Sequence, residues 1–163
     1  MKTLVVYYSR TKTSEKLAKN LADKLDAGLE EVIDRRDYSG ALGYIAGGRD
    51  ALMKKEGEIE ELKNNARDYD LVIIVTPVWA GNMVPGIRSF IRQEKDVLGD
   101  VVFIATQGSS REQKVFRDLE EEVGRGAVVQ EFFTTKEIQR DEFGEKLDEL
   151  VGEIRGLEKE GEN

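Results

Sequence analysis

Five short segments rich in β-branched and aromatic residues are spread along the chain, and each has the length of one β-strand. They are residues 3–8, 29–33, 71–75, 101–105 and 127–133. The segments 3–8 and 71–75 are apolar at consecutive positions, which is typical of strands that are buried on both faces. The pattern therefore predicts a parallel sheet that is covered by helices.

Between these segments, apolar residues recur three or four positions apart, which is the spacing of amphipathic helices. We predict four such helices, over residues 17–25, 85–91, 115–123 and 143–157. Proline suits a first helical turn, so Pro85 marks the start of the second one. The segment 35–57 also has helical spacing, but its glycines lower the helix propensity, and we interpret it as a helical connection with a loose start.

The alternation of strand and helix predicts an α/β fold with a doubly wound parallel sheet and right-handed crossovers. We expect a single domain over residues 1–157 and a polar, frayed tail over 158–163. In such sheets ligands bind beyond the carboxyl ends of the strands. The loops at that edge follow the first, third and fourth predicted strands, and function is expected there.

The composition excludes several kinds of catalytic and metal site and disfavours several kinds of partner. The chain has neither cysteine nor histidine, which excludes a disulfide framework, a thiolate nucleophile, a Ser-His relay and a Cys/His zinc site. The formal net charge of −8 disfavours nucleic acid and anionic membranes as partners. No apolar run reaches membrane-spanning length, and the first predicted strand leaves no room for a signal peptide, so we expect a cytoplasmic protein.

The first loop, Ser9-Arg10-Thr11-Lys12-Thr13-Ser14, combines four hydroxyls with two cations just before a predicted helix. Free backbone N–H groups and the positive end of the helix dipole favour an anion there, and hydroxyl donors suit a phosphate monoester. A polar turn with a hydroxyl cap is the simpler alternative. Neither a P-loop nor a G-x-G-x-x-G motif is present, which disfavours ATP hydrolysis and Rossmann-type dinucleotide binding.

The second loop, residues 76–85, contains the single tryptophan of the chain, Trp79. An indole at the carboxyl end of a strand can stack on a planar ligand, or it can fold back and cover the edge of the sheet. The dipeptide Ala80-Gly81 favours a tight turn with a positive φ at the glycine. The third loop begins at Thr106 and offers an amide side chain and backbone N–H groups, which can bind the edge of a heteroaromatic ring.

Together the three loops resemble the flavodoxin family. Its first loop is commonly [ST]-x-T-G-x-T, and residues 9–14 stand in that place. Residues 76–83 look like the flavin-stacking loop, and their Gly-Asn-Met end also resembles the flavodoxin-like quinone reductases. The resemblance covers essentially the whole chain. It implies a flavodoxin-like five-stranded sheet in the order 2-1-3-4-5, with helices on both faces and FMN as the cofactor.

Carried over by position, the resemblance implies that the first loop holds the FMN phosphate. The residues are Ser9, Thr11, Thr13 and Ser14 through their hydroxyls, and Arg10 and Lys12 through backbone N–H groups. Lys12 departs from the family pattern, which has glycine there. Either the loop geometry is relaxed, or the lysine adds charge near the phosphate.

The resemblance assigns the flavin ring to the other two loops. Trp79 stacks on the isoalloxazine, and Ala80 and Gly81 face its N5 edge. The implied cofactor-binding residues are Pro77, Val78, Trp79, Ala80, Gly81 and Asn82 in the second loop, and Thr106, Gln107, Gly108 and Ser109 at the pyrimidine edge. The third loop lacks the tyrosine that many flavodoxins stack on the outer ring face, which leaves that face open to a nicotinamide or a quinone.

Two functions fit this resemblance. An acidic surface beside the flavin favours an electron carrier that docks on redox partner proteins through charge. The open ring face favours an NAD(P)H-dependent FMN or quinone reductase. A cofactor-free interaction domain is a further alternative, but it leaves Trp79 and the hydroxyl loop unexplained. A receiver domain needs acidic residues where Tyr8-Ser9 and Thr76-Pro77 stand, and a low-molecular-weight phosphatase needs a cysteine. We favour the carrier, with no expectation for the oligomeric state.

Overall fold

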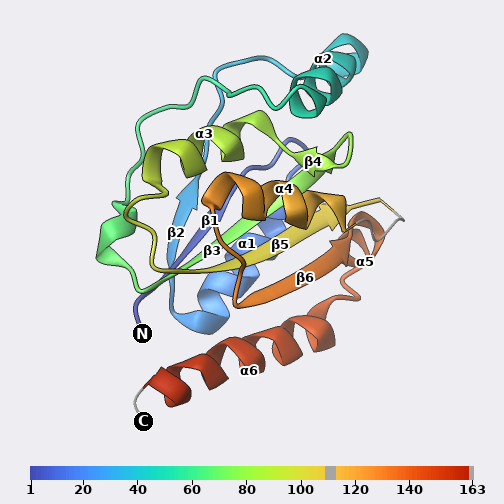
Figure 1. The fold of residues 1–163 in the computed structure, drawn as a ribbon. Coiled ribbons are helices and arrows are strands. Elements are labelled where there is room, and N and C mark those ends of the chain that lie inside the picture. The colour runs from blue at the N-terminus through green and yellow to red at the C-terminus, as the bar shows by residue number, and fades with distance from the viewer. Residues whose placement is uncertain (109–112, 162–163) are drawn as a thin grey trace.

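A twisted parallel sheet forms the centre of the molecule (Figure 1). The structure is a computed structural model that describes residues 1–108 and 113–161. The parallel strands lie in the order β2-β1-β3-β5-β6. Their bounds are Thr3–Tyr7 for β1, Gly28–Glu31 for β2, Leu71–Trp79 for β3, Asp100–Gln107 for β5 and Val129–Thr134 for β6. The predicted α/β fold with a parallel sheet is confirmed.

A sixth strand corrects the predicted strand count and order. The two-residue strand β4 (Asn82–Met83) pairs with β3 in the antiparallel direction. The described sheet therefore has six strands with the path 2-1-3-5-6, and not five strands in the order 2-1-3-4-5. The prediction ended the third strand near Pro77, whereas β3 continues to Trp79 and turns back into β4. A strand of two residues is too short to leave a periodic signal in the sequence.

Helices cover both faces of the sheet, as predicted. α1 (Thr13–Leu25) and α6 (Gly144–Gly161) pack on one face, and α3 (Pro85–Glu94) and α4 (Lys114–Val123) pack on the other. The final helix extends through Gly161, beyond its predicted end at residue 157. A short helix that the sequence did not suggest, α5 (Thr135–Gln139), begins with a capping box. No helix within the described ranges is long and apolar enough to span a membrane.

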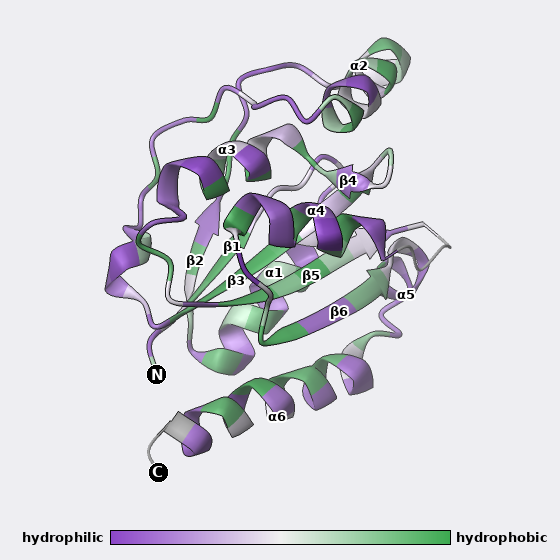
Figure 2. Cartoon of the chain, in the orientation of Figure 1, coloured by the Kyte–Doolittle hydropathy of each residue, from purple (hydrophilic) through white to green (hydrophobic). Residues whose placement is uncertain are grey.

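The strands are apolar on both sides because each side is packed under helices. In β1, Leu4 and Val6 contact the core beneath α3 and α4, whereas Val5 and Tyr7 contact the core beneath α1 and α6. Figure 2 shows the central strands β1, β3 and β5 as mainly hydrophobic, with the hydrophilic positions of the helices turned away from the sheet. This alternation explains why the strand segments read as continuous apolar runs.

The glycine-rich segment between β2 and β3 contains one regular helix, α2 (Gly40–Leu52), followed by a 3-10 turn, η1 (Ala66–Asp68). The predicted helical connection is therefore correct. In Figure 1, α2 lies apart from the two helical layers, beyond α3 and β4. Several of its apolar side chains are exposed, namely Leu42, Tyr44, Ile45 and Leu52.

A buried ion pair joins the α3–α4 layer to the end of the sheet. The guanidinium of Arg88 lies 2.6 Å from Asp118 Oδ2 and donates a second hydrogen bond, 2.8 Å long, to Glu122. Arg88 and Asp118 are only 1% and 3% exposed. Asp118 Oδ2 also accepts the backbone N–H of Met83, so this carboxylate fixes β4.

We predict that Arg88→Met lowers the free energy of unfolding by about 3 kcal/mol, because it leaves the buried Asp118 carboxylate with only the half-exposed Lys54, 3.6 Å away, as a charge partner. Arg92→Met is the matched control, since Arg92 binds the same Glu122 from a side chain that is 38% exposed. It should cost less than about 1 kcal/mol. Urea unfolding measures both values. Equal small losses of unfolding free energy in the two variants would show that the buried ion pair contributes no more to stability than the exposed one.

Candidate functional site

Two adjoining cavities lie at the carboxyl ends of the central strands. The larger one, about 380 Å³, is enclosed by α2 and the end of β3, and we call it the apolar cavity. The smaller one, about 200 Å³, lies against the first loop and the end of β5, and we call it the hydroxyl cavity. The two share four lining residues, which are Arg10, Tyr44, Val78 and Trp79.

The hydroxyl cavity is built at the start of α1. Thr13 and Ser14 are buried in the first helical turn, and no side chain caps that helix. Its leading N–H groups therefore face the cavity without an intrahelical partner. The hydroxyls of Ser14 and Thr106 lie 2.7 Å apart and tie the first loop to β5. The result is a concentration of hydrogen-bond donors at the positive end of a helix, which suits an anion.

Lys12 precedes this helix in a left-handed conformation, with φ of 62°. Glycine adopts that backbone without steric cost, whereas a residue with a β-carbon is strained there. Lys12 thus has a backbone conformation that favours glycine, and the two expectations for this residue, a relaxed loop or a charge near the phosphate, stay predictions. The side chain is exposed and lines neither cavity.

Two buried polar atoms in the wall of the hydroxyl cavity have no hydrogen-bond partner among the described residues. They are Ser9 Oγ and Gln107 Nε2. Four other buried polar atoms of the described chain, on Asp34, Asn82, Arg88 and Asp118, are also unpaired, so such atoms do not by themselves identify a ligand site. Within this wall, Ser9 can pair with a polar ligand through its hydroxyl, and Gln107 can donate to one through its amide.

The Trp79 segment is a β-hairpin rather than an open loop. Trp79 pairs with Asn82, and the two residues between them, Ala80 and Gly81, have φ of 49° and 78°. Positive φ at both central positions is typical of a type I′ turn, which fits the twist of paired strands. Gly81 therefore has the positive φ expected from the sequence, and Ala80 shares it at a steric cost.

Trp79 both covers the sheet and faces the cavities. Its ring packs edge-to-face against Tyr8 and Tyr38, with centroids 5.5 Å and 5.3 Å away. Gly47 of α2 lies so close that an added β-carbon would stand 2.8 Å from the indole Cζ3. The remaining indole surface lines both cavities, so Trp79 covers the sheet as in the second alternative, and its stacking on a planar ligand stays a prediction. Burial, with a smaller contribution from Asp34, raises the pKa of Tyr8 to about 12, and this tyrosine stays neutral.

Hydrogen bonds at both ends hold α2 over the hairpin. Asn82 Nδ2 donates to the carbonyl of Ala51 over 3.0 Å, and the Arg10 guanidinium donates to the carbonyl of Gly40 over 3.0 Å. Asp50 accepts from the Tyr38 hydroxyl. Burial disfavours the Asp50 carboxylate, but the hydrogen bonds from Tyr38 and Arg49 outweigh it and hold its pKa below the ordinary value.

Most of the predicted site residues line a cavity. Those in the hydroxyl cavity are Ser9, Arg10, Thr11, Thr13, Ser14, Pro77, Val78, Trp79, Thr106, Gln107 and Gly108, and Ala80 lines the apolar cavity. Lys12, Gly81 and Asn82 line neither, and Asn82 instead binds α2. Ser109 lies outside the described residues.

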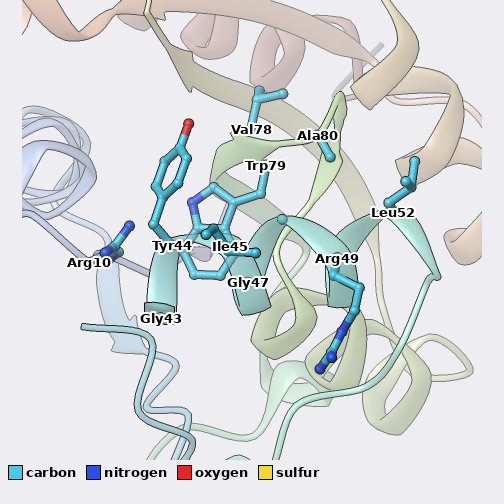
Figure 3. A pocket seen from close by; sticks show the side chains of 11 residues that line it. Arg10, Gly43, Tyr44, Ile45, Gly47, Arg49, Leu52, Val78, Trp79 and Ala80 are labelled. Carbon is cyan, nitrogen blue, oxygen red and sulfur yellow. The ribbon is translucent and has the colours of Figure 1, made fainter. Parts of the chain in front are cut away.

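Sequence reasoning predicted the helix α2 but did not assign it to the site, although it supplies most of the wall of the apolar cavity. Figure 3 shows its residues around the indole of Trp79, with Arg10 on one side and Leu52 on the other. The spacing of Gly43 and Gly47, one helical turn apart, was the available signal, because a glycine face lets a helix approach an aromatic ring closely. In the sequence these glycines were interpreted only as residues that lower helix propensity, so their role in close packing was not predicted.

Comparisons with known proteins show the family of the chain. A family model described as flavodoxin matches residues 2–150. The chain belongs to the flavodoxin family. The resemblance seen in the sequence is therefore confirmed. No curated protein matches the chain significantly.

Solved structures place this flavodoxin-family chain among flavoproteins. It is 25% identical to a flavoprotein from Lactobacillus acidophilus NCFM in complex with FMN, with a TM-score of 0.71 over 85% of this chain and 97% of that chain. A candidate flavoprotein from Bacteroides eggerthii DSM 20697 is 23% identical, with a TM-score of 0.68 over 85% and 94%. An NADH:FMN oxidoreductase in its apo form is 16% identical, with a TM-score of 0.57 over 95% and 89%. The last two likenesses show a shared fold.

We predict that Lys12→Gly raises the free energy of unfolding by about 0.5–1 kcal/mol. The substitution removes the left-handed strain at this position, and this gain exceeds the loss that comes from the greater freedom of glycine in the unfolded chain. Lys12→Ala removes the same charge but keeps a β-carbon, so it should give no gain. Thermal unfolding compares the two variants, and an equal gain from both would assign the effect to charge.

Proposed function

We propose that the chain binds FMN at the two joined cavities and carries electrons between redox partner proteins. The observation that carries this proposal is the junction itself. A donor-rich cavity at a helix N-terminus shares four lining residues, including the indole of Trp79, with an apolar cavity, and this combination matches a molecule with a phosphate at one end and a flat ring at the other. Bound FMN would supply the redox chemistry through its isoalloxazine ring.

The phosphate and ribityl end of FMN fits the hydroxyl cavity. The start of α1 offers free N–H groups and the hydroxyls of Thr11 and Thr13, which accounts for three phosphate oxygens. The unpartnered Ser9 Oγ lies in the same wall. At the other end, the unpartnered Gln107 Nε2 would donate to a carbonyl oxygen at the pyrimidine edge of the ring.

The flat ring of FMN requires the apolar cavity as well. The hydroxyl cavity alone, at about 200 Å³, lies below the roughly 300–1,000 Å³ of typical cofactor sites. Val78 and Trp79 line both cavities, so a ring lying against them extends from one cavity into the other. Ala80 continues this wall, as the family resemblance implied for the N5 edge of the ring.

The cavity walls favour electron transfer over acid–base chemistry. Among the described residues that line them, the ionisable side chains are Arg10, Arg49 and Tyr44. An arginine keeps its proton in proteins, and no carboxylate, lysine or histidine stands among the described residues of either wall to exchange one near neutral pH. A one-electron carrier needs no such group, so the carrier role fits these walls.

The negative net charge of the chain favours partner proteins with basic surfaces. The net charge of −8 steers a basic partner toward the molecule and repels acidic ones. We propose that such a partner docks at the edge of the sheet where the cavities open. Association driven in this way weakens as ionic strength rises.

A second candidate is an NAD(P)H-dependent FMN or quinone reductase. The apolar cavity favours it, because about 380 Å³ exceeds what the benzenoid end of a flavin fills. The remaining space would admit a planar electron donor or acceptor beside the ring.

The phosphate site can be tested with Thr13→Val, which keeps the side-chain shape and removes one donor. We predict that FMN affinity falls about two- to tenfold, corresponding to about 0.5–1.5 kcal/mol for a lost hydrogen bond, while riboflavin affinity is unchanged. Thr3→Val, at the opposite end of β1, is the matched control. Fluorescence titration gives the affinities. If FMN and riboflavin bound equally well to the unmodified protein, the phosphate site would be wrong.

The carrier role can be tested by following electrons in two assays. We predict that the holoprotein does not accelerate oxidation of NADH or NADPH by menadione above the rate with free FMN. After reduction by dithionite, it should reduce cytochrome c, a basic one-electron acceptor, at a rate that falls with salt. Rapid NAD(P)H turnover with menadione would reject the carrier and support the reductase.

A further inference from the structure

Tyr44 of α2 stands where the two cavities meet. It is one of the four residues that line both of them, although its side chain is 69% exposed. Figure 3 shows its phenol ring beside the indole of Trp79 and next to Arg10. A large aromatic side chain that is left this exposed in a cavity wall presents a surface on which a flat ligand can pack.

The surrounding structure fixes the position of Tyr44 relative to the Trp79 hairpin. Gly47, three residues after Tyr44 on α2, packs directly against the indole. The hydrogen bond from the Arg10 guanidinium to the Gly40 carbonyl holds the start of the helix. The hydrogen bond from the Asn82 amide to the Ala51 carbonyl holds its end. The backbone under Tyr44 is therefore held in place, while its ring remains available.

Arg10 orients the Tyr44 ring. The guanidinium carbon lies 5.5 Å from the ring centroid, within the range of a cation–π contact. Because Arg10 also belongs to the first loop, this contact links the ring to the loop that we assign to the phosphate. Segment 106–113, which follows the neighbouring strand, has no aromatic residue that could take this position instead.

We propose that Tyr44 is the second stacking residue of the flavin site, covering the ring face opposite the wall of Val78 and Trp79. This inference rests on the proposed function. It makes α2, rather than the third loop, the source of the outer aromatic wall. Since Tyr44 acts on the ring, it contributes equally to the binding of any flavin, with or without a phosphate.

The test compares Tyr44→Ala, Tyr44→Phe and Leu42→Ala in titrations with FMN and with riboflavin. Tyr44→Ala should weaken both ligands by the same factor, about two- to twelvefold, the usual worth of an aromatic pair. Tyr44→Phe keeps the ring and should retain the affinity. Leu42 lies on the same helix, is 83% exposed and lines neither cavity, so Leu42→Ala should change nothing.

Three results would overturn the inference. Unchanged affinities in Tyr44→Ala would show that the ring is not used, and a loss for FMN alone would show that Tyr44 acts through Arg10 on the phosphate. A loss in Tyr44→Ala that Tyr44→Phe shares would assign the effect to the hydroxyl and also reject stacking. Failure of the proposed function has a different signature, because the unmodified protein would then bind neither FMN nor riboflavin.

Discussion

The contact between Gly47 and the indole of Trp79 determines the shape of the site. At that position a β-carbon would stand 2.8 Å from the ring, so only glycine lets α2 lie flat on the hairpin. The helix in turn closes the apolar cavity and brings Tyr44 to the junction with the hydroxyl cavity. Without this approach, the end of β3 would carry an indole on an open edge of the sheet, and no two-walled cavity would form.

The layers of the fold could be predicted from the sequence because burial on both faces imposes continuous apolar runs. Leu71 to Val75 is fully buried, and so is its neighbour β5 from Val102 to Ala105. The hairpin was missed because its second strand, β4, is only two residues long and is fixed by a distant group. That group, Asp118 on α4, binds the Met83 N–H, and no local pattern encodes such a contact.

The part of the site that is formed by residues adjacent in the sequence could be predicted. The first loop combines hydroxyls with a helix start, and both features can be read from residues 9–14. The α2 wall depends instead on tertiary packing, because the same glycines that weaken a helix in isolation permit its contact with Trp79. Charge was equally deceptive, since a chain of net charge −8 has two arginines and no carboxylate among the described residues that line the apolar and hydroxyl cavities.

Backbone amide shifts measured by NMR during ligand titration test most directly whether one ligand occupies both cavities. The account predicts that FMN shifts the amides of segments 9–14, 78–80 and 43–48 together, and that inorganic phosphate shifts only the first of these. An FMN titration that left segment 43–48 unchanged would contradict it, because α2 would then be no part of the flavin site.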